Sequence, residues 1–359
     1  MTYGIKGLRR VNLGKEATAG TAVAPTTTWR GNGDMLEDKR TVSFPDELSG
    51  IVGGIDRSYI AKYEGSWKIA DTPATFEQLG YLLSSAFGFP GTAASANGTA
   101  RIYQRAIPTT SVPSPAPGGA GGTAQTYTIE AGDNIEAEQA TYGLVTKTSF
   151  TFVGGEAVKV SGELIARSVG TTNTAGTFNS TPSLPVVEDI LAGLGTVYLD
   201  SISGTYATTV FSNRVLGGKL DCTWKWIPKW TIDNGRLDFA YAVYTGHDIK
   251  GELTLEQAAN TSGLSGSQYD NWRTQTAQLL TLRLNGGSIS GAGTLATAPF
   301  GTIATKALIF ALPIKYTSVS ALGDQSGNGI RTFSFDSEYN VTAGNAGTIV
   351  IVNSNGSLV

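Results

Sequence analysis

A pair of β-strands that occurs twice in the chain constrains the fold more than any other sequence feature. The first copy joins residues 41–45 to residues 58–69, and the second joins residues 223–228 to residues 248–255. In each copy a proline closes the first, alternating strand, and a glycine lies in the middle of the second strand. A repeat of this size predicts a chain built from two similar β domains, and such chains often build symmetric assemblies.

The composition of the 359 residues agrees with strands, turns and covered surfaces. The chain has 46 glycines, and 40% of its residues are hydrophobic, which is enough for a sizeable core. Only 15% of the residues are charged, against roughly 25% in average soluble proteins. Because the cores of protein interfaces are depleted in charge, this low value indicates that neighbouring copies cover part of the surface.

We therefore expect an all-β fold with minor helix content, made of two similar β-sandwich or barrel-like domains. Each domain is expected to carry one flanking helix, at residues 74–87 in the first and at residues 267–278 in the second, because apolar or aromatic side chains recur there at helical spacing. The predicted order is an extended arm at 1–40, a first β domain at 41–170 with a long loop at 108–125, a linker at 171–185, and a second β domain at 186–359.

Two of these segments have compositions that do not favour regular structure. The arm is polar and rich in Gly, Ala and Thr, so on its own it should not fold stably. It is expected either to drape over its own domain or to order against a neighbour. The loop is rich in Pro and Gly, and the strands predicted at 100–107 and 125–130 make it read as the tip of a long hairpin.

Residues suited to catalysis or metal binding are sparse. The chain has one cysteine, Cys222, and one histidine, His247. No Gly-x-Ser-x-Gly elbow surrounds a candidate serine, and no phosphate-binding loop motif is present. One cysteine and one histidine do not make a zinc cluster. We expect no enzyme activity, no cofactor and no metal site.

The charge balance and hydropathy argue against several partners. The net charge is −3 and no basic run stands out, which argues against sequence-specific nucleic-acid binding. A neutral or acidic surface is still compatible with DNA that slides past without sticking. No run of about 18 apolar residues predicts a membrane span. The N-terminal residues hold no apolar signal-peptide stretch, so we expect the chain to be made and folded in a cytosol.

Three tryptophans, Trp224, Trp226 and Trp230, share one face of a predicted strand, with Lys225 and Lys229 opposite. Such a row could be a platform for carbohydrate binding. It could equally be covered by the domain core or by a neighbouring subunit, and we favour core or interface because tryptophan is common in both.

The chain resembles the tail tube proteins (major tail proteins) of long-tailed, siphovirus-like bacteriophages. The resemblance lies in the Gly/Ala/Thr-rich arm at 14–26, in the order of strand pair, helix (74–87) and further strands, and in the late hairpin at 148–165 with its glycine-rich tip. It covers much of the first half and, through the repeat, more weakly the second half.

The resemblance implies a structural virion protein that self-assembles into stacked rings, forming the hollow tail tube through which DNA is delivered. Family members usually form hexameric rings; with two tube-like halves, three copies would make a pseudo-hexameric ring, and with a false repeat a hexamer is expected. The implied partners are other copies of the chain, the tape measure protein, the tail terminator and the tail tip proteins, with transient passage of DNA. The alternative function is a carbohydrate-binding β module or adhesin that uses the tryptophan strand.

The resemblance also implies that the arm and a loop reach neighbouring subunits or rings. Deleting residues 1–25 is then expected to leave the fold intact and abolish tube formation. The candidate contact residues are Lys15, Glu16, Thr18, Val23 and Trp29 in the arm, Val112 and Pro115 in the loop, and Trp224 and Trp226 in the second half.

Overall fold

The computed structural model confirms that the chain is mostly β, with 54% of its residues in strands and 7% in helices. It describes residues 3–47, 50, 52, 57–89, 95–115, 122–172, 176–211, 214–232, 235–257, 264–290, 296–297 and 300–356. In this part of the chain, 18 strands are hydrogen-bonded into one large antiparallel sheet that does not close on itself.

Eight strands follow one another across the main part of this sheet. In spatial order they are β3 (Glu37–Ser43), β4 (Tyr59–Pro73), β9 (Lys159–Ala166), β8 (Ala137–Val153), β12 (Val215–Lys229), β13 (Tyr241–Glu256), β19 (Asn328–Ser337) and β17 (Thr305–Val319). Both copies of the strand pair predicted from the sequence are present, as the β3–β4 hairpin and the β12–β13 hairpin.

Shorter strands branch from this row of eight. Beyond β17 lie β14 (Gln278–Ser288) and β11 (Gly195–Ser201), and beside the first part of β17 lie β20 (Thr348–Asn353), β6 (Ala100–Ala106) and β5 (Ser95–Asn97). The first part of β8 carries β7 (Tyr127–Gly132) and β10 (Val169–Thr171), and β7 continues to β1 (Arg10–Lys15) and β2 (Thr27–Thr28). The remaining short elements are β18 (Gly323–Gln325), which pairs with β19, the separate pair β15 (Ala296–Thr297) and β16 (Gly301–Thr302), and the 3-10 helices η1 (Lys6–Leu8) and η2 (Ala192–Leu194).

Two α-helices accompany the sheet, and both differ in extent from the sequence prediction. Helix α1 (Leu79–Phe87) lies against the inner face of the sheet and ends at Gly88, whose φ of 74° is left-handed. It starts later than predicted: the backbone of Ala74 is hydrogen-bonded to Val158 and Ile190, and residues 76–78 form a turn before the helix begins. Helix α2 (Leu264–Arg273) packs near the end of β17, and ends before the predicted residue because Gln278 already belongs to β14.

A continuous hydrophobic core lies beneath the row of eight strands. It joins side chains from both sides of the predicted linker at 171–185: Phe150 packs on Phe310, with ring centroids 5.0 Å apart. Strands β8 and β12 are also paired, from Lys147 with Thr223 to Val153 with Gly217. Alternation along β12 explains which side chains enter the core, since Leu220 and Cys222 point inward while Lys219 and Asp221 point outward.

The arm at 1–40 forms part of the sheet, and the long loop at 108–125 is not the tip of a hairpin. Strand β1 of the arm pairs along its whole length with β7, and its Val11 and Leu13 are buried. The prediction of a hairpin around residues 108–125 is wrong, because β6 pairs with β20 and β5, whereas β7 pairs with β1 and β8. The loop therefore connects two distant parts of the sheet; its residues 116–121 lie outside the described part of the chain.

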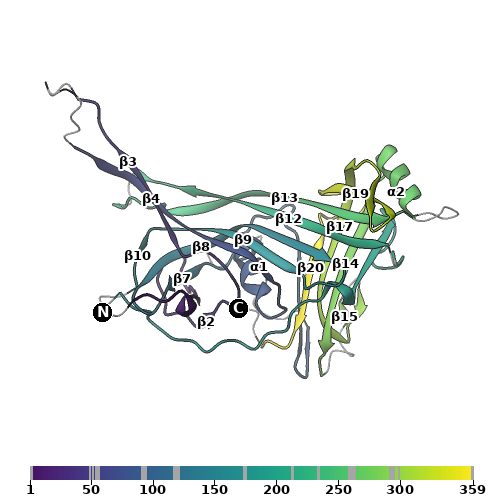
Figure 1. The fold of residues 1–359 in the computed structure, drawn as a ribbon, viewed down its shortest axis with the longest axis horizontal. Helices are drawn as coiled ribbons and strands as arrows, with labels where there is room; N and C mark the ends of the chain where they lie inside the picture. The colour runs from purple at the N-terminus through teal and green to yellow at the C-terminus, as the bar shows by residue number, and fades with distance from the viewer. Residues whose placement is uncertain are drawn as a thin grey trace.

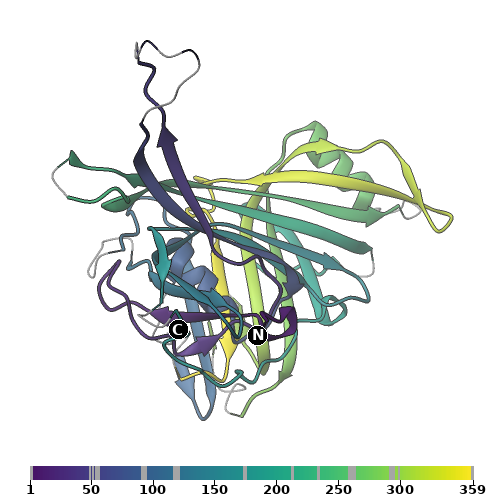
Figure 2. The same ribbon diagram turned by 60° about the vertical axis from the view of Figure 1, so that its left-hand side comes forward.

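The overall shape is a broad sheet with the core and α1 on one side, and the β3–β4 hairpin forms a long projection from it. Figure 1 shows the β3–β4 hairpin rising away from the body, with β12 and β13 crossing the molecule beneath it. Figure 2, turned by 60°, shows the same hairpin standing free of the body.

Candidate interaction surface

The outer face of the row of eight strands is polar, and we call it the polar face. Its outward-pointing side chains belong to the strands from β4 to β17, and they alternate with the core residues. The polar face includes Lys68, Lys147, Ser149, Lys159, Ser161, Glu163, Lys219, Asp221, Thr223, Lys225, Asp248, Lys250, Glu252, Ser334, Asp336, Lys315 and Thr317.

Ion pairs run between neighbouring strands and along single strands of the polar face. Lys225 Nζ lies 2.8 Å from Asp248 Oδ2, and Lys219 Nζ lies 2.8 Å from Asp221 Oδ2. Partial burial opposes ionisation of Asp221, but hydrogen bonds from Lys219 and Ser149 outweigh this and lower the pKa of the carboxyl group. Hydrogen bonding to Asp221 in turn raises the pKa of Lys219. Both groups are therefore charged at neutral pH.

Two strands with an open side lie at the ends of the surface that carries the polar face, namely β3 and β18, which lies beyond the part of β17 that pairs with β14. In the described part of the chain, β3 pairs with β4 alone, and β18 pairs with β19 alone. Near the second edge, the Gln275 side chain donates a hydrogen bond to Tyr316 O at 3.3 Å, so that backbone group is satisfied. Open strand edges present rows of backbone donors and acceptors and readily pair with another chain.

The β3–β4 hairpin projects with apolar side chains in solvent. Val42, Phe44 and Tyr59 are all exposed, and Phe44 keeps 58% of its surface accessible. An isolated two-stranded hairpin is only marginally stable in water. Its base is held by the 230–240 segment, where Leu237 O accepts from Tyr63 N at 3.2 Å and Lys62 lies over the Trp230 ring.

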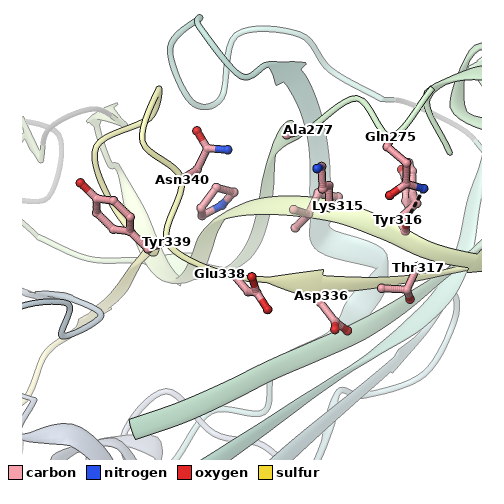
Figure 3. Close-up of a pocket in the computed structure, with 11 residues that line it drawn as sticks. Gln275, Ala277, Lys315, Tyr316, Thr317, Asp336, Glu338, Tyr339 and Asn340 are labelled. Atoms are coloured by element: carbon pink, nitrogen blue, oxygen red, sulfur yellow. Dashed lines mark hydrogen bonds between the residues drawn. The ribbon is translucent and has the colours of Figure 1, made fainter.

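The hollows of the polar face are shallow. A pocket of about 280 Å³ lies at its far end, where β17 diverges from the start of β14. Figure 3 shows Lys315, Thr317 and Asp336 along the neighbouring strands there, with Glu338, Tyr339 and Asn340 on the chain that leaves β19. This pocket contains no pairing of nucleophile and base that would suggest catalysis.

The contact residues predicted from the sequence fall into three classes of exposure. Lys15, Thr18 and Val112 are exposed, and Val23 and Pro115 are half-buried. Four others are buried within their own chain: Glu16, Trp29, Trp224 and Trp226. The Trp29 ring packs edge to face on Trp67, with centroids 6.0 Å apart, so it anchors the arm to the body.

The tryptophan strand does not present a platform to solvent. Trp224 and Trp226 are only 1% and 5% exposed, and they point into the core under β12. Trp226 Nε1 donates to Ala86 O at 2.9 Å. Trp230 is partly exposed beside Lys62, beyond the point where the strand ends at Lys229.

Cys222 and His247, the two residues best suited to catalysis or metal binding, are packed within the fold. Cys222 is buried, and this burial raises the pKa of its thiol to about 12. Burial also lowers the pKa of His247, whose Nδ1 is 3.1 Å from the Tyr244 hydroxyl. Among the described residues, no group of three or more His, Cys, Asp and Glu side chains is placed to hold a metal ion.

The sequence analysis named Lys225 as lying opposite the tryptophans, but it did not identify the polar face as a surface or the two open edges. A signal for the polar face was present in the alternation of Lys219, Asp221, Thr223 and Lys225 with core residues. No local signal identifies an open edge, because an edge is defined by the absence of a partner strand.

No family model matches the chain, and no curated protein matches it significantly. Within the described residues, no helix is both long enough and apolar enough to cross a membrane.

Proposed function

We propose that the chain is a structural protein of the tail tube type, which assembles with other copies of itself into rings and stacks them into a hollow tube. The observation that carries the proposal is the order of the strands between the two open edges. This order reads as two units of the same topology joined side by side, which is an arrangement that further copies can extend.

Each unit consists of a hairpin, a helix and a second hairpin. In the first unit β4 of the β3–β4 hairpin pairs with β9 of the β8–β9 hairpin, giving the order β3-β4-β9-β8. In the second, β13 pairs with β19, giving the order β12-β13-β19-β17. Helices α1 and α2 follow β4 and β13, respectively.

The mid-strand glycines predicted from the sequence occupy matching places in the two units. Gly65 in β4 pairs with Asp38 on one side and Ala166 on the other. Gly251 in β13 pairs with Leu220 on one side and Phe335 on the other. Two residues further along each strand, Trp67 and Leu253 are both buried. This correspondence supports a duplicated unit.

The internal junction between the units suggests how copies meet. Strand β8, at the end of the first unit, pairs with β12, at the start of the second. The corresponding strands at the ends of the chain's own row are β3 and β18, which continues the line of β17 beyond its pairing with β14; within the described residues, each of these two strands pairs on one side only. Pairing of β18 in one copy with β3 in the next would repeat the β8–β12 junction, and three copies would close a pseudo-hexameric ring.

The exposed parts of the molecule supply further contacts in this proposal. The projecting β3–β4 hairpin, with Val42, Phe44 and Tyr59 in solvent, gains a covering surface when it lies against a neighbouring copy. Lys15, Thr18 and Val112 are exposed and available for contacts between rings. The tape measure, tail terminator and tail tip proteins are the proposed partners at the inside and the ends of the tube, and the proposed location is the phage virion.

The alternative, a carbohydrate-binding module, receives less support. Its platform would need Trp224 and Trp226 in solvent, and both are in the core. A sugar-binding module also has no use for two open strand edges, which are a hazard in a protein that remains a monomer.

Cysteine pairs placed by the β8–β12 register test the proposal. Thr223 and Lys147 are directly paired at the β8–β12 junction. When the two units are matched, Thr41 in the first unit corresponds to Thr223 in the second. Ser320, whose backbone N–H donates to Thr332 O, likewise corresponds to Lys147. The double variant Thr41→Cys/Ser320→Cys should form disulfide-linked oligomers, because paired Cα atoms lie within bridging distance. The control is Thr41→Cys/Thr342→Cys, which has an equally exposed second cysteine outside the edge.

Negative-stain electron microscopy of the concentrated protein gives the second readout. Rings or hollow tubes, together with covalent oligomers of the first variant only, are the expected result. Particles that remain monomeric at every concentration, with no cross-linking of either variant, would contradict the proposal.

A further inference from the structure

The mid-strand glycines align the first strand of one unit with the first strand of the other. Gly65 pairs with Asp38 in β3, and Gly251 pairs with Leu220 in β12, so Asp38 and Leu220 hold the same place relative to the glycines. Further along each hairpin the register shifts by one residue, with the extra residue in β4 and in β13, respectively. The two hairpins therefore have a bulge as well as a glycine at similar places.

This alignment gives two buried tryptophans an exposed counterpart each. Counting along β3 and β12 from the aligned residues places Val42 with Trp224 and Phe44 with Trp226. Both tryptophans are buried, whereas Val42 is 46% exposed and Phe44 is exposed to a similar extent. The end of the β3–β4 hairpin thus lacks, within the described part of the chain, the cover that the same part of β12 has.

The cover of the two tryptophans is the helix of the other unit. The Trp224 ring stacks on Phe87, the last residue of α1. Trp226 Nε1 donates a hydrogen bond to Ala86 O in the same helix. At the junction inside the chain, the first hairpin of one unit therefore packs on the helix of the unit beside it.

Helix α2 holds the place of α1 in its own unit. Helix α1 packs on β8 and α2 packs on β17, the last strands in the orders of the two units. The Ser85 hydroxyl of α1 donates to Gly143 O in β8 at 3.4 Å, and Gln275, just beyond α2, donates to Tyr316 O in β17. Gly143 and Tyr316 fall at the same level of the sheet when β8 and β17 are matched through their partners β9 and β19.

The two helices differ in how far they are covered. Every residue of α1 except Tyr81 is buried. Among residues 267–273 of α2 only Gln268 is buried, while Tyr269 and Trp272 are partly exposed and residues 273–276 at its C-terminal end are all exposed. Figure 1 shows α1 within the body and α2 at the rim of the sheet. The end of α2 that corresponds to the tryptophan-covered end of α1 is therefore open to solvent.

We propose that the end of the β3–β4 hairpin docks on the C-terminal end of α2 in the neighbouring copy, with Val42 and Phe44 in the places that Trp224 and Trp226 take on α1. This inference rests on the proposed function, because the β18–β3 junction is what brings the hairpin of one copy over α2 of the next. The contact continues between copies the one that the chain already makes between its own units.

The occupant of α2 is a second copy and not the same chain. Strands β3 and β17 lie at opposite ends of the row of eight strands, roughly 30 Å apart at about 4.8 Å per strand. The two surfaces have matching chemistry, since Phe44 on the hairpin and Tyr269 and Trp272 on α2 are rings that keep part of their surface in water. Burying such rings against one another is favourable, and aromatic side chains carry much of the binding energy at interfaces.

Site-specific photo-crosslinking tests the contact directly. Phe44 is replaced by the photoreactive amino acid p-benzoylphenylalanine, isotopically labelled and unlabelled copies are mixed and concentrated, and the crosslinked peptides are identified by mass spectrometry after irradiation. Position 44 should link to residues 267–276 of a copy that carries the other label. The control places the same amino acid at Tyr241, an exposed ring in the β12–β13 hairpin, and should give no link to α2.

The concentration needed for assembly gives an independent measurement by light scattering. Phe44→Ser should raise this concentration at least about tenfold, as expected when an aromatic anchor is removed from an interface. Tyr241→Ser is the control and should assemble like the wild type. Both side chains are exposed in the single chain, so thermal unfolding followed by circular dichroism should be unchanged in both variants. Assembly of Phe44→Ser at the wild-type concentration overturns the inference.

The docking contact and the proposed ring fail separately. Rings in which position 44 crosslinks to another part of the neighbour, or to nothing, overturn the docking on α2 and leave the assembly standing. Crosslinks from position 44 to α2 in a protein that forms only small oligomers support the docking and remove the ring. Monomers that give no crosslink at any concentration contradict both.

Discussion

The ring of Phe87, at the end of α1, stacks face to face on the ring of Trp224 in the middle of β12, with centroids 4.7 Å apart and planes 11° apart. Beside this pair, Ala86 O accepts the hydrogen bond from Trp226 Nε1. A helix from the N-terminal half is thus the packing partner of the first long strand of the C-terminal half. The two halves share one core.

The Phe87→Ala substitution should lower the free energy of unfolding by about 3–5 kcal/mol, which is typical when a buried phenylalanine is truncated. Because the core is shared, unfolding should remain a single transition when followed by tryptophan fluorescence and by circular dichroism. The control, Phe44→Ala, alters an exposed ring and should change stability by less than about 0.5 kcal/mol. Two separate transitions in the wild-type protein would show that the halves unfold independently.

A second link between the halves is ionic. Lys306 Nζ on β17 lies 2.6 Å from Glu77 Oε1 and 2.9 Å from Glu188 Oε2, and the Glu77 side chain is only 7% exposed. Lys306→Met should lower the free energy of unfolding by about 2–4 kcal/mol, because it leaves a buried carboxylate without its partner. The control is Lys225→Met, which removes an exposed pair and should have a small effect. Chemical denaturation measures both variants.

The same cluster predicts how stability depends on pH. Burial opposes ionisation of Glu188, but hydrogen bonds from Lys306 and Gly287 outweigh it and lower its pKa. Its contribution is present above the pKa of the unfolded chain and is lost as pH falls through the lower, folded pKa. Burial also opposes the charge of Lys306, yet hydrogen bonds to Glu188 and Glu77 raise its pKa. That contribution is present below the unfolded pKa and is lost as pH rises through the folded value.

Thermal unfolding across the pH range should therefore show a plateau that declines on both the acid and the alkaline side. In Lys306→Met both declines should become shallower, because the two shifts depend on the same contacts. An unchanged pH profile in this variant would mean that the cluster does not govern the pH dependence.

The mid-strand glycines should resist substitution for a steric reason. A Cβ atom at Gly251 would lie 2.4 Å from Phe335 Cζ and 2.7 Å from Lys219 O, and one at Gly65 would lie 2.5 Å from Arg167 O. Gly251→Ala and Gly65→Ala should each lower stability by about 1–3 kcal/mol. Gly170→Ala is the matched control in a strand, because a Cβ there meets open space. Equal stabilities of the three variants would show that the strands relax around the added methyl group.

The sequence predicted local strands well and long-range partners poorly. The β3–β4 and β12–β13 hairpins were predictable because alternation and breaker residues act over a few neighbours. The pairing of β8 with β12 joins segments about 70 residues apart, and no local pattern encodes which strand will lie beside which. For the same reason the loop at 108–125 was read as a hairpin tip.

The candidate contact residues show a related limit. A charged residue in a Gly/Ala/Thr-rich stretch is predicted to lie at the surface in contact with water. Lys15 is indeed exposed. Glu16 is expected to be solvated for the same reason, yet it is buried, because Gly20 from the following turn and two donors from distant segments, Thr128 and Tyr142, surround its carboxylate. Only the folded chain brings these donors together.

The carboxylate of Glu16 holds the arm against the body. Its Oε2 accepts a hydrogen bond from Gly20 N at 2.6 Å, and its Oε1 accepts from Tyr142 N at 2.9 Å and from Thr128 Oγ1 at 3.1 Å. Tyr142 has a left-handed φ of 62°, a conformation that non-glycine residues adopt only when the surroundings enforce it. Glu16 thus fixes both the turn that follows β1 and an unusual point of the backbone of β8.

The Glu16→Ala substitution should cost about 1–3 kcal/mol, because it leaves buried donors unsatisfied. The effect should be concentrated in the arm: hydrogen exchange at residues 16–26 should accelerate well before exchange in β12 or β13. Lys15→Ala is the control, since Lys15 is exposed and adjacent. Uniform acceleration across the chain, or none in the arm, would contradict this role.

This network also changes the expectation for deletion of residues 1–25. The sequence alone predicted an intact fold without them, but the deletion removes β1, exposes the paired side of β7 and uncovers the core beneath Val11 and Leu13. We therefore expect the deletion to lower the midpoint of thermal unfolding, and any loss of assembly to be accompanied by loss of stability. Glu16→Ala is the more informative test of the arm in assembly, since it leaves β1 and its apolar side chains in place. Rings from Glu16→Ala that match those of the wild type would show that the anchored turn is not needed between copies.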